Sequence, residues 1–242
     1  MSAAGVLDPA LLLGAYSVGV FPMADSREAR SIYWVEPRQR AILPLDGFHL
    51  SRSLRRTIAA DRFRVTVDQA FDRIIALCAE AVEGRPDTWI NAMIEDAFLR
   101  LHALGYAHSV ECWDGDRLVG GLYGLALGRA FFGESMVSRA TDASKVAIAA
   151  LVARLTAGGY TLLDCQFMTT HLASLGACEI DRADYMALLG AALSSTGSSA
   201  GVSSPGSAAG AEAGDFFALD ARAGTDGAVS GKVVVQLLGQ TS

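Results

Sequence analysis

Residues 107–166 constrain the fold of this chain more than any other stretch, because they predict a definite order of strands. Two strand-like runs over 107–113 and 117–126 flank Asp114-Gly115-Asp116, a combination that is typical of a β-hairpin. A short turn then leads into a third apolar run over 130–137. We therefore expect three antiparallel strands that follow one another across a sheet.

A helix and a further strand follow this antiparallel unit. Residues 143–156 are rich in Ala, Leu and Val and end before Gly158-Gly159, as expected of a buried helix. Residues 160–166 form the next apolar run. Three antiparallel strands, a crossover helix and a further strand predict the α+β class. The same order describes a GCN5-related acyltransferase-like core, which is an analogy of fold and does not determine function.

Shorter elements surround this core. We expect helices over 8–16, 50–60, 68–83, 91–104 and 182–193, and strands over 32–35 and 41–43. Asp8 and Pro9 suit the N-cap and the first helical position, and Gly105 suits the residue after a helix. Residues 1–65 are therefore expected to form a smaller N-terminal α/β domain, and residues 66–193 the acyltransferase-like catalytic domain.

The composition changes abruptly after the last predicted helix. Residues 194–214 are nearly all Ser, Gly and Ala, which predicts a flexible linker because such side chains bury too little surface to offset the entropy of ordering. Residues 215–242 are expected to form a C-terminal tail. Its apolar run over 232–238 predicts a strand that docks on the sheet.

The composition indicates a folded protein of a reducing compartment. The 242 residues are 51% hydrophobic, yet no apolar run approaches the ~20 residues of a membrane-spanning helix. The first basic residue is Arg27, so a secretory signal is not expected. The cysteines form no CxxC pair, which disfavours disulfides and zinc sites and predicts a cytoplasmic location. They are Cys78, Cys112, Cys165 and Cys178.

Positive charge is concentrated in one region of an acidic chain. The formal net charge is −6, but residues 38–64 hold seven arginines against two acidic residues. A basic patch can contact phosphates while the acidic remainder limits indiscriminate nucleic-acid binding. Arg52, Arg55 and Arg56 share one predicted helix, where a solvated face and a phosphate-binding face are both open interpretations.

Polar side chains interrupt two of the apolar runs. In Asp164-Cys165-Gln166, strand alternation puts Asp164 and Gln166 on one face and Cys165 on the other, in the core. A polar pair that faces a substrate and a strand end that bonds to a neighbouring loop are equally compatible with this pattern. A nucleophilic Cys165 is not favoured, because no His is adjacent in sequence and buried cysteines are usually inert. Glu134 lies among Phe, Gly and Met, which favours a pocket over a solvated strand edge.

Together with other segments, these runs resemble one known family. Its blocks follow one unbroken order over residues 7–190. The blocks are Trp34, residues 49–56, Trp89-Ile90 and residues 132–139, 163–166 and 171–179. In this order they are similar to the leucyl/phenylalanyl-tRNA–protein transferase family.

The resemblance implies an aminoacyltransferase. Such an enzyme moves Leu, Phe and, less readily, Met from aminoacyl-tRNA to the N-terminal Arg or Lys of an acceptor protein, which marks that protein for N-end rule degradation. The donor is already an activated ester and the nucleophile is an α-amine with a pKa of about 7.7–8.0, so no cofactor or metal is expected. The resemblance also implies a monomer without a membrane partner.

The same resemblance assigns catalytic roles. Gln166, oriented by Asp164, is expected to contact the attacking amine, and Glu134 to position the amine or the ribose. Because a neutral amide is a poor base, the proton can pass through Gln166, the 2′-hydroxyl of the tRNA or water, and these routes stay open. Strict alternation would separate Phe131 from Glu134, so a β-bulge at Gly133 is needed to bring both to the site.

Binding roles follow from the resemblance as well. Trp34 and Trp89 are expected to hold the 3′-terminal adenine of the tRNA by stacking. Leu122 and Leu151 stand where Met and Phe are expected, which leaves the preference between Leu and Phe open. The apolar amino-acid pocket is assigned to Phe98, Leu122, Phe131, Ile148, Leu151 and Leu163. Phosphate contacts are assigned to Arg52, Arg55 and Arg56.

Two other functions stay open. One is a CoA-dependent N-acetyltransferase of the same fold, and the other is a non-catalytic RNA-binding module. Residues 117–122 superficially resemble the pyrophosphate loop of acetyltransferases, but they deviate at Leu122 and lie in a predicted strand instead of at a helix N-terminus. The sequence therefore favours aminoacyl transfer over acetyl transfer.

Overall fold

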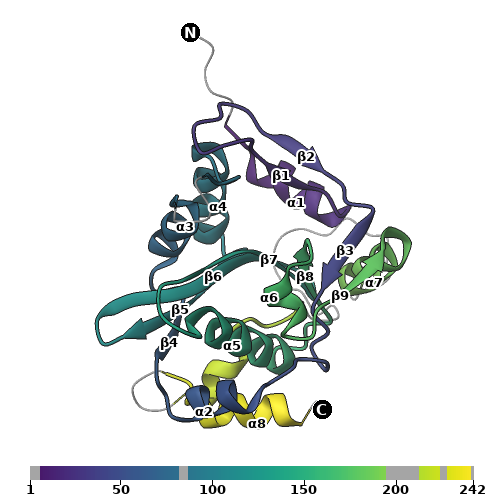
Figure 1. Ribbon diagram of the computed structural model, residues 1–242. Helices are drawn as coiled ribbons and strands as arrows, with labels where there is room; N and C mark the ends of the chain where they lie inside the picture. The colour runs from purple at the N-terminus through teal and green to yellow at the C-terminus, as the bar shows by residue number, and fades with distance from the viewer. Residues whose placement is uncertain (1–5, 82–86, 195–212, 224–227, 241–242) are drawn as a thin grey trace, which may run out of the picture.

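A seven-stranded sheet forms the centre of the molecule in the computed structural model, which describes residues 6–81, 87–194, 213–223 and 228–240 (Figure 1). Its strands are β3 Gln39–Ile42, β4 Arg64–Val67, β5 Ala107–Asp114, β6 Arg117–Leu127, β7 Ala130–Ser138, β8 Leu162–Gln166 and β9 Cys178–Asp181. Their order across the sheet is β4-β5-β6-β7-β8-β3-β9. A separate antiparallel pair consists of β1 Phe21–Met23 and β2 Tyr33–Val35.

The predicted order of the core elements is confirmed. Strands β5, β6 and β7 pair antiparallel in sequence order. Helix α5 Ala143–Ala157 then crosses to β8, which pairs parallel to β7. The β-bulge expected at Gly133 is also present, because Tyr123 faces Ser135 while Gly124 faces Gly133. Glu134 is the extra residue of the bulge.

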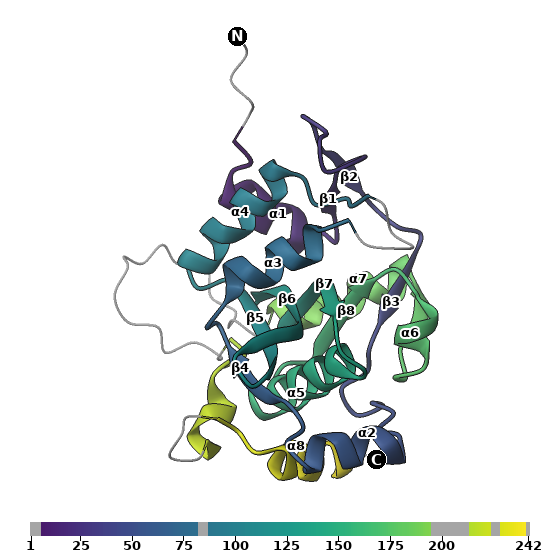
Figure 2. The same ribbon diagram turned by 60° about the vertical axis from the view of Figure 1, so that its left-hand side comes forward.

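Helices cover both faces of the sheet (Figure 1, Figure 2). They are α1 Pro9–Ser17, α2 Arg52–Ala59, α3 Phe71–Ala79, α4 Ala92–Ala103, α5, α6 Thr170–Ala173, α7 Arg182–Ser194 and α8 Gly231–Gly239, with a 3-10 helix η1 over Ala218–Arg222. Helices α2, α5 and α8 pack in one apolar core, and α1, α3, α4 and α7 in another. Phe131 belongs to the first core and Phe132 to the second, as strand alternation requires.

Side-chain caps explain where three helices begin. The Asp8 carboxylate accepts a hydrogen bond from the Ala10 amide at 2.7 Å, and Pro9 opens α1 as predicted. Ser51 caps α2 and Asn91 caps α4 in the same way. These contacts satisfy amide groups that the first turn of a helix leaves without a partner.

Several elements of the sheet edges were not predicted. Strands β1, β4 and β9, the short helix α6 and the 3-10 helix η1 were missed. Helix α3 begins at Phe71 instead of residue 68, because Asp68 adopts a left-handed φ of 55° and accepts the Ser109 amide at 2.7 Å. The predicted domain boundary at residue 65 falls inside β4, and β3 joins the main sheet. The division into two domains stays a prediction.

The strand predicted over 232–238 is wrong, since this segment is helix α8. Its buried side chains Val234, Leu237 and Leu238 recur at helical spacing and pack against α2 and α5. A short apolar run fits a strand and a buried helix equally well, so tertiary packing decides. The predicted linker over 194–214 lies almost entirely outside the described residues.

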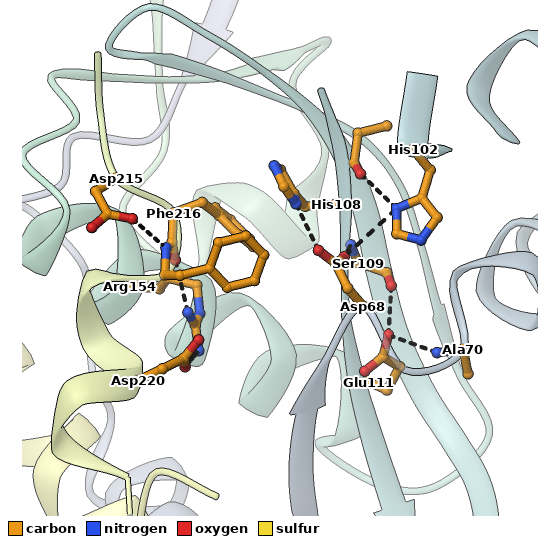
Figure 3. Close-up of polar contacts among 12 residues, drawn as sticks. Asp68, Ala70, His102, His108, Ser109, Glu111, Arg154, Asp215, Phe216 and Asp220 are labelled. Atoms are coloured by element: carbon orange, nitrogen blue, oxygen red, sulfur yellow. Dashed lines mark hydrogen bonds and ion pairs between the residues drawn. The ribbon is translucent and has the colours of Figure 1, made fainter. Parts of the chain in front are cut away.

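The C-terminal segment is anchored to the body through Phe216 (Figure 3). The Phe216 ring stacks on His108 with centroids 4.1 Å apart and on Phe131 at 5.5 Å. Arg154 of α5 donates to the Phe216 carbonyl at 2.7 Å and pairs with Asp220 at 2.5 Å. Within the described part of the chain, no helix is long and apolar enough to cross a membrane.

Candidate active site

A cavity of about 840 Å³ opens beside β6, β7 and β8 and is closed by helices α5 and α6 and by strand β1. Four of the predicted pocket residues line it, namely Leu122, Ile148, Leu151 and Leu163. Trp89 lines it as well, from the loop before α4. The cavity therefore joins an apolar wall to an aromatic ring at its rim.

Three of the predicted binding residues do not line the cavity. Phe98 is fully buried and packs on the rings of Tyr16 and Tyr123. Phe131 is fully buried behind the wall, on Phe216. These two side chains complete the hydrophobic cores and do not form the surface of the pocket. Trp34 lies in β2 and is 40% exposed.

The bulge in β7 turns Glu134 into the cavity beside Gln166. The Gln166 side-chain amide donates to the Glu134 carboxylate, Nε2 to Oε1, at 3.0 Å. Removal from water raises the pKa of Glu134 to about 8, from an ordinary value of 4.5. The Tyr16 hydroxyl and the Arg40 guanidinium oppose this rise, and the Asp164 carboxylate adds to it.

The three residues that end β8 do not alternate as predicted. Gln166 adopts a left-handed φ of 56°, and both Cys165 and Gln166 line the cavity. Asp164 is fully buried and does not line it. Its Oδ1 accepts the Gln166 amide at 2.8 Å. The expectation that Asp164 orients Gln166 is consistent with this contact. Cys165 packs against the first core, as expected, but it also lines the cavity.

Arg40 and Tyr185 complete the surroundings of Asp164. Arg40 Nη2 lies 2.6 Å from Asp164 Oδ2, and Arg40 Nε donates to both carboxylate oxygens at 2.8 and 3.0 Å. The Tyr185 hydroxyl donates to Oδ2 at 2.9 Å. Sequence reasoning missed both residues and counted Arg40 in the basic patch. The available signal was an arginine directly before the apolar run Ala41-Ile42-Leu43.

The cavity holds two further groups with shifted proton affinity. Burial, and secondarily Asp164, raises the pKa of the Cys165 thiol far above its usual range, so the thiol stays protonated at neutral pH. Burial, and secondarily Lys145, lowers the pKa of His171, which favours a neutral imidazole. Among the described residues, no group of three or more His, Cys, Asp or Glu side chains could hold a metal ion.

The arginines of α2 lie apart from the cavity. Arg52, Arg55 and Arg56 are exposed on this helix. Arg40 is buried, and Arg62 forms a two-pronged pair with Asp114 at 2.9 Å. In both views α2 lies at the opposite end of the molecule from β2, which carries Trp34 (Figure 1, Figure 2).

Comparison with known proteins gives one consistent result. The chain matches the family "Leucyl/phenylalanyl-tRNA protein transferase" over residues 42–190 and the N-terminal domain of that family over residues 5–38. The leucyl/phenylalanyl-tRNA–protein transferase of Rhizorhabdus wittichii is 62% identical over 246 residues, which is 98% of this chain and 99% of that protein. The relative in Phenylobacterium zucineum is 50% identical over 96% of both chains. The relative in Afipia carboxidovorans is 48% identical over 100% of this chain and 97% of that protein.

Proposed function

Because this chain belongs to the leucyl/phenylalanyl-tRNA–protein transferase family, we propose that it moves Leu, Phe and, less readily, Met from aminoacyl-tRNA to the N-terminal Arg or Lys of acceptor proteins. This transfer would mark the acceptors for N-end rule degradation. The observation that carries the proposal is the cavity itself, in which an apolar wall meets the hydrogen-bonded pair Gln166 and Glu134.

The apolar wall suits an unbranched or γ-branched hydrophobic side chain. Leu122 comes from β6, Ile148 and Leu151 from α5, and Leu163 from β8, so several rigid elements shape the pocket. Burying such a side chain contributes about 1.5–3 kcal/mol to binding. Phe131 supports this wall from behind, through the core that it shares with Leu163.

The chemistry needs positioning and the removal of one proton. The amine nitrogen attacks the ester carbonyl carbon, and the tetrahedral oxyanion collapses as the bond to the ribose oxygen breaks. That oxygen leaves with a proton. Since the donor is an activated ester, orientation of the amine and stabilisation of the oxyanion are the main tasks of the protein.

The proposal assigns the orientation of the amine to Gln166 and Glu134. With its Nε2 bound to Glu134, Gln166 can present its carbonyl oxygen to the amine. The pKa of about 8 at Glu134 lies near that of the acceptor amine, which favours proton exchange between them. We assign the acceptance of the amine proton to ionised Glu134, and the same proton then passes from Glu134 to the leaving oxygen by way of the 2′-hydroxyl or water.

The tRNA is proposed to contact two ends of the molecule. Trp89 at the cavity rim and the exposed Trp34 would hold the terminal adenine, a contact worth about 1–3 kcal/mol per stacked base. Arg52, Arg55 and Arg56 of α2 would meet phosphates farther along the acceptor arm. We further propose a cytoplasmic location, supported by cysteines that form no CxxC pair in the sequence, and a monomer. We also propose a GCN5-related acyltransferase-like core, supported by the strand order of the sheet.

The acetyltransferase alternative has little support. Gly120 and Gly121 lie inside strand β6, and their missing side chains allow close packing. A Cβ at Gly120 would approach Ala143 to 2.6 Å, and one at Gly121 would approach Ile74 to 2.4 Å. These glycines therefore serve helix–sheet packing: they lie within a strand and do not form the loop that leads into a helix, which is where a pyrophosphate would bind.

One assay tests the proposed function. The protein is mixed with radiolabelled Leu-tRNA and a peptide with an N-terminal Arg, and the label in the peptide is measured. We expect the unmodified protein to transfer the label. The Gln166→Ala substitution should lower kcat and leave tRNA binding nearly unchanged. Bound tRNA without transfer would favour an RNA-binding module, and acetylation from acetyl-CoA would favour an acetyltransferase.

A further inference from the structure

We propose that Arg40 and Tyr185 are positioning residues for the transfer reaction, which hold the Asp164 carboxylate so that it keeps Gln166 in its working orientation. The inference rests on the proposed function, because it concerns the side chain that meets the amine. Arg40 and Tyr185 do not line the cavity, so they act from behind its surface, through their contacts with Asp164 and, for Arg40, through a positive charge near Glu134 that a lysine would retain.

The carboxylate of Asp164 is fixed by several donors at once. Arg40 donates to both oxygens, the Tyr185 hydroxyl donates to Oδ2, and the Gln166 amide donates to Oδ1. The three donor residues come from different elements, since Arg40 lies in β3, Tyr185 in α7 and Gln166 at the end of β8, which also carries Asp164. A carboxylate with this set of partners has one orientation.

Gln166 needs such support because its backbone is in an unfavourable region. A left-handed φ of 56° in a residue other than Gly costs about 1–2 kcal/mol and persists only where neighbours enforce it. Strand β3 pairs with β8 at Ala41 opposite Gln166, directly beside Arg40. The hydrogen bond to Asp164 Oδ1 then holds the turn that points the Gln166 side chain at Glu134.

Arg40 is held as rigidly as the group that it positions. Its guanidinium lies 4.6 Å from the ring centroids of both Phe21 and Tyr185, and its Nη1 donates to the Gly19 carbonyl at 3.1 Å. Phe21 itself lines the cavity. A planar, two-pronged cation that stacks between rings cannot be replaced by the point charge of a lysine without loss of geometry.

The free energy of folding does not by itself explain the buried ion pair between Arg40 and Asp164. Arg40 is 1% exposed and Asp164 is fully buried, and the cost of desolvating such a pair often offsets its attraction. What the ion pair provides, and apolar side chains of the same volume would not, is a fixed orientation of Gln166.

A double-mutant cycle tests the proposal with an aminoacyl-adenosine donor, which avoids effects on tRNA contacts. We expect Arg40→Lys and Tyr185→Phe each to lower kcat by about 10- to 100-fold, the range of one lost charge-assisted hydrogen bond, with little change in KM. In a Gln166→Ala background the same substitutions should lower kcat no further. The matched control is Arg62→Lys, which alters an exposed two-pronged pair and should leave kcat unchanged.

The outcomes separate this proposal from the proposed function. If Gln166→Ala lowers kcat and the Arg40 or Tyr185 substitutions multiply that loss, the two residues do not act through Gln166 and the proposal fails alone. If the unmodified chain transfers no label, the proposed function fails. Crystal structures of the Tyr185→Phe and Arg40→Lys proteins test the orientation of Gln166 independently of kinetics. If Gln166 keeps its left-handed backbone and its hydrogen bond to Glu134 in both variants, the positioning role is refuted.

Discussion

Glu134→Gln should change how the stability of this protein depends on pH. The pKa of Glu134 is raised to about 8 from an ordinary 4.5, so the folded state binds a proton that the unfolded state has lost between these values. The free energy of unfolding should therefore fall as pH rises through this window. The slope due to this one group is at most about 1.4 kcal/mol per pH unit, or nearly 3 kcal/mol between pH 5 and 7.

The glutamine removes this contribution because it is neutral at every pH and nearly the same size. Urea unfolding at several pH values should show that the stability difference between Glu134→Gln and the unmodified protein grows in favour of the variant from pH 5 to pH 8. Glu179→Gln, an exposed carboxylate on β9, is the control and should show a constant difference. Parallel curves for Glu134→Gln would mean that Glu134 is already ionised in the folded protein at pH 5, and would refute the reasoning. Turnover of the unmodified enzyme should also rise with pH toward about 8 if ionised Glu134 accepts the proton.

Three further perturbations address the tRNA contacts and the C-terminal segment. Replacing the three exposed arginines of α2 with Ala should weaken tRNA binding and reduce the slope of log binding constant against log salt concentration by up to about two to three units. An unchanged slope would show that these arginines form a solvated helix face and do not contact phosphates. Trp89→Ala should lower catalytic efficiency by about one to two decades with both tRNA and aminoacyl-adenosine donors, and thermal melts would reveal unfolding if the ring is instead structural. Phe216→Ala should lower the free energy of unfolding by about 3–5 kcal/mol because its ring stacks on Phe131 and His108, whereas Phe217→Ala, at a side chain that is 47% exposed, should cost far less in the same urea titration.

Local signals were sufficient to predict the core of the fold. The hairpin at Asp114-Gly115-Asp116 and the side-chain cap at Asp8 each depend on a few neighbouring residues, and both are observed. The bulge at Gly133 was predicted as well, but it turns only Glu134 into the cavity, and Phe131, which was expected at the same site, stays in the core. Such features depend on sequence spacing and little on distant contacts.

Elements whose partners lie far away in the chain were harder to predict. Strand β4 is short and has an exposed edge, and it exists through its pairing with β5. The sequence of helix α8 predicted a strand, because its Val-rich run is compatible with either state. Contact with α2 and α5 stabilises the helix. In the pocket, Phe98 and Phe131 were assigned to the wall although both are core residues one layer behind it. Sequence position does not distinguish these two depths.

The geometry at the polar end of the cavity depends both on local sequence patterns and on contacts between residues that are remote in sequence. Gln166 and Glu134 stood out in the sequence because polar groups inside apolar runs need partners. Their actual meeting depends on two departures from regular strand geometry, the bulge that turns Glu134 inward and the left-handed backbone of Gln166. The second departure is stabilised by Asp164, whose own partners on β3 and α7 are remote in sequence. A site that depends on strained backbone must recruit such distant support, so the residues that enforce its geometry are those that sequence patterns reveal least.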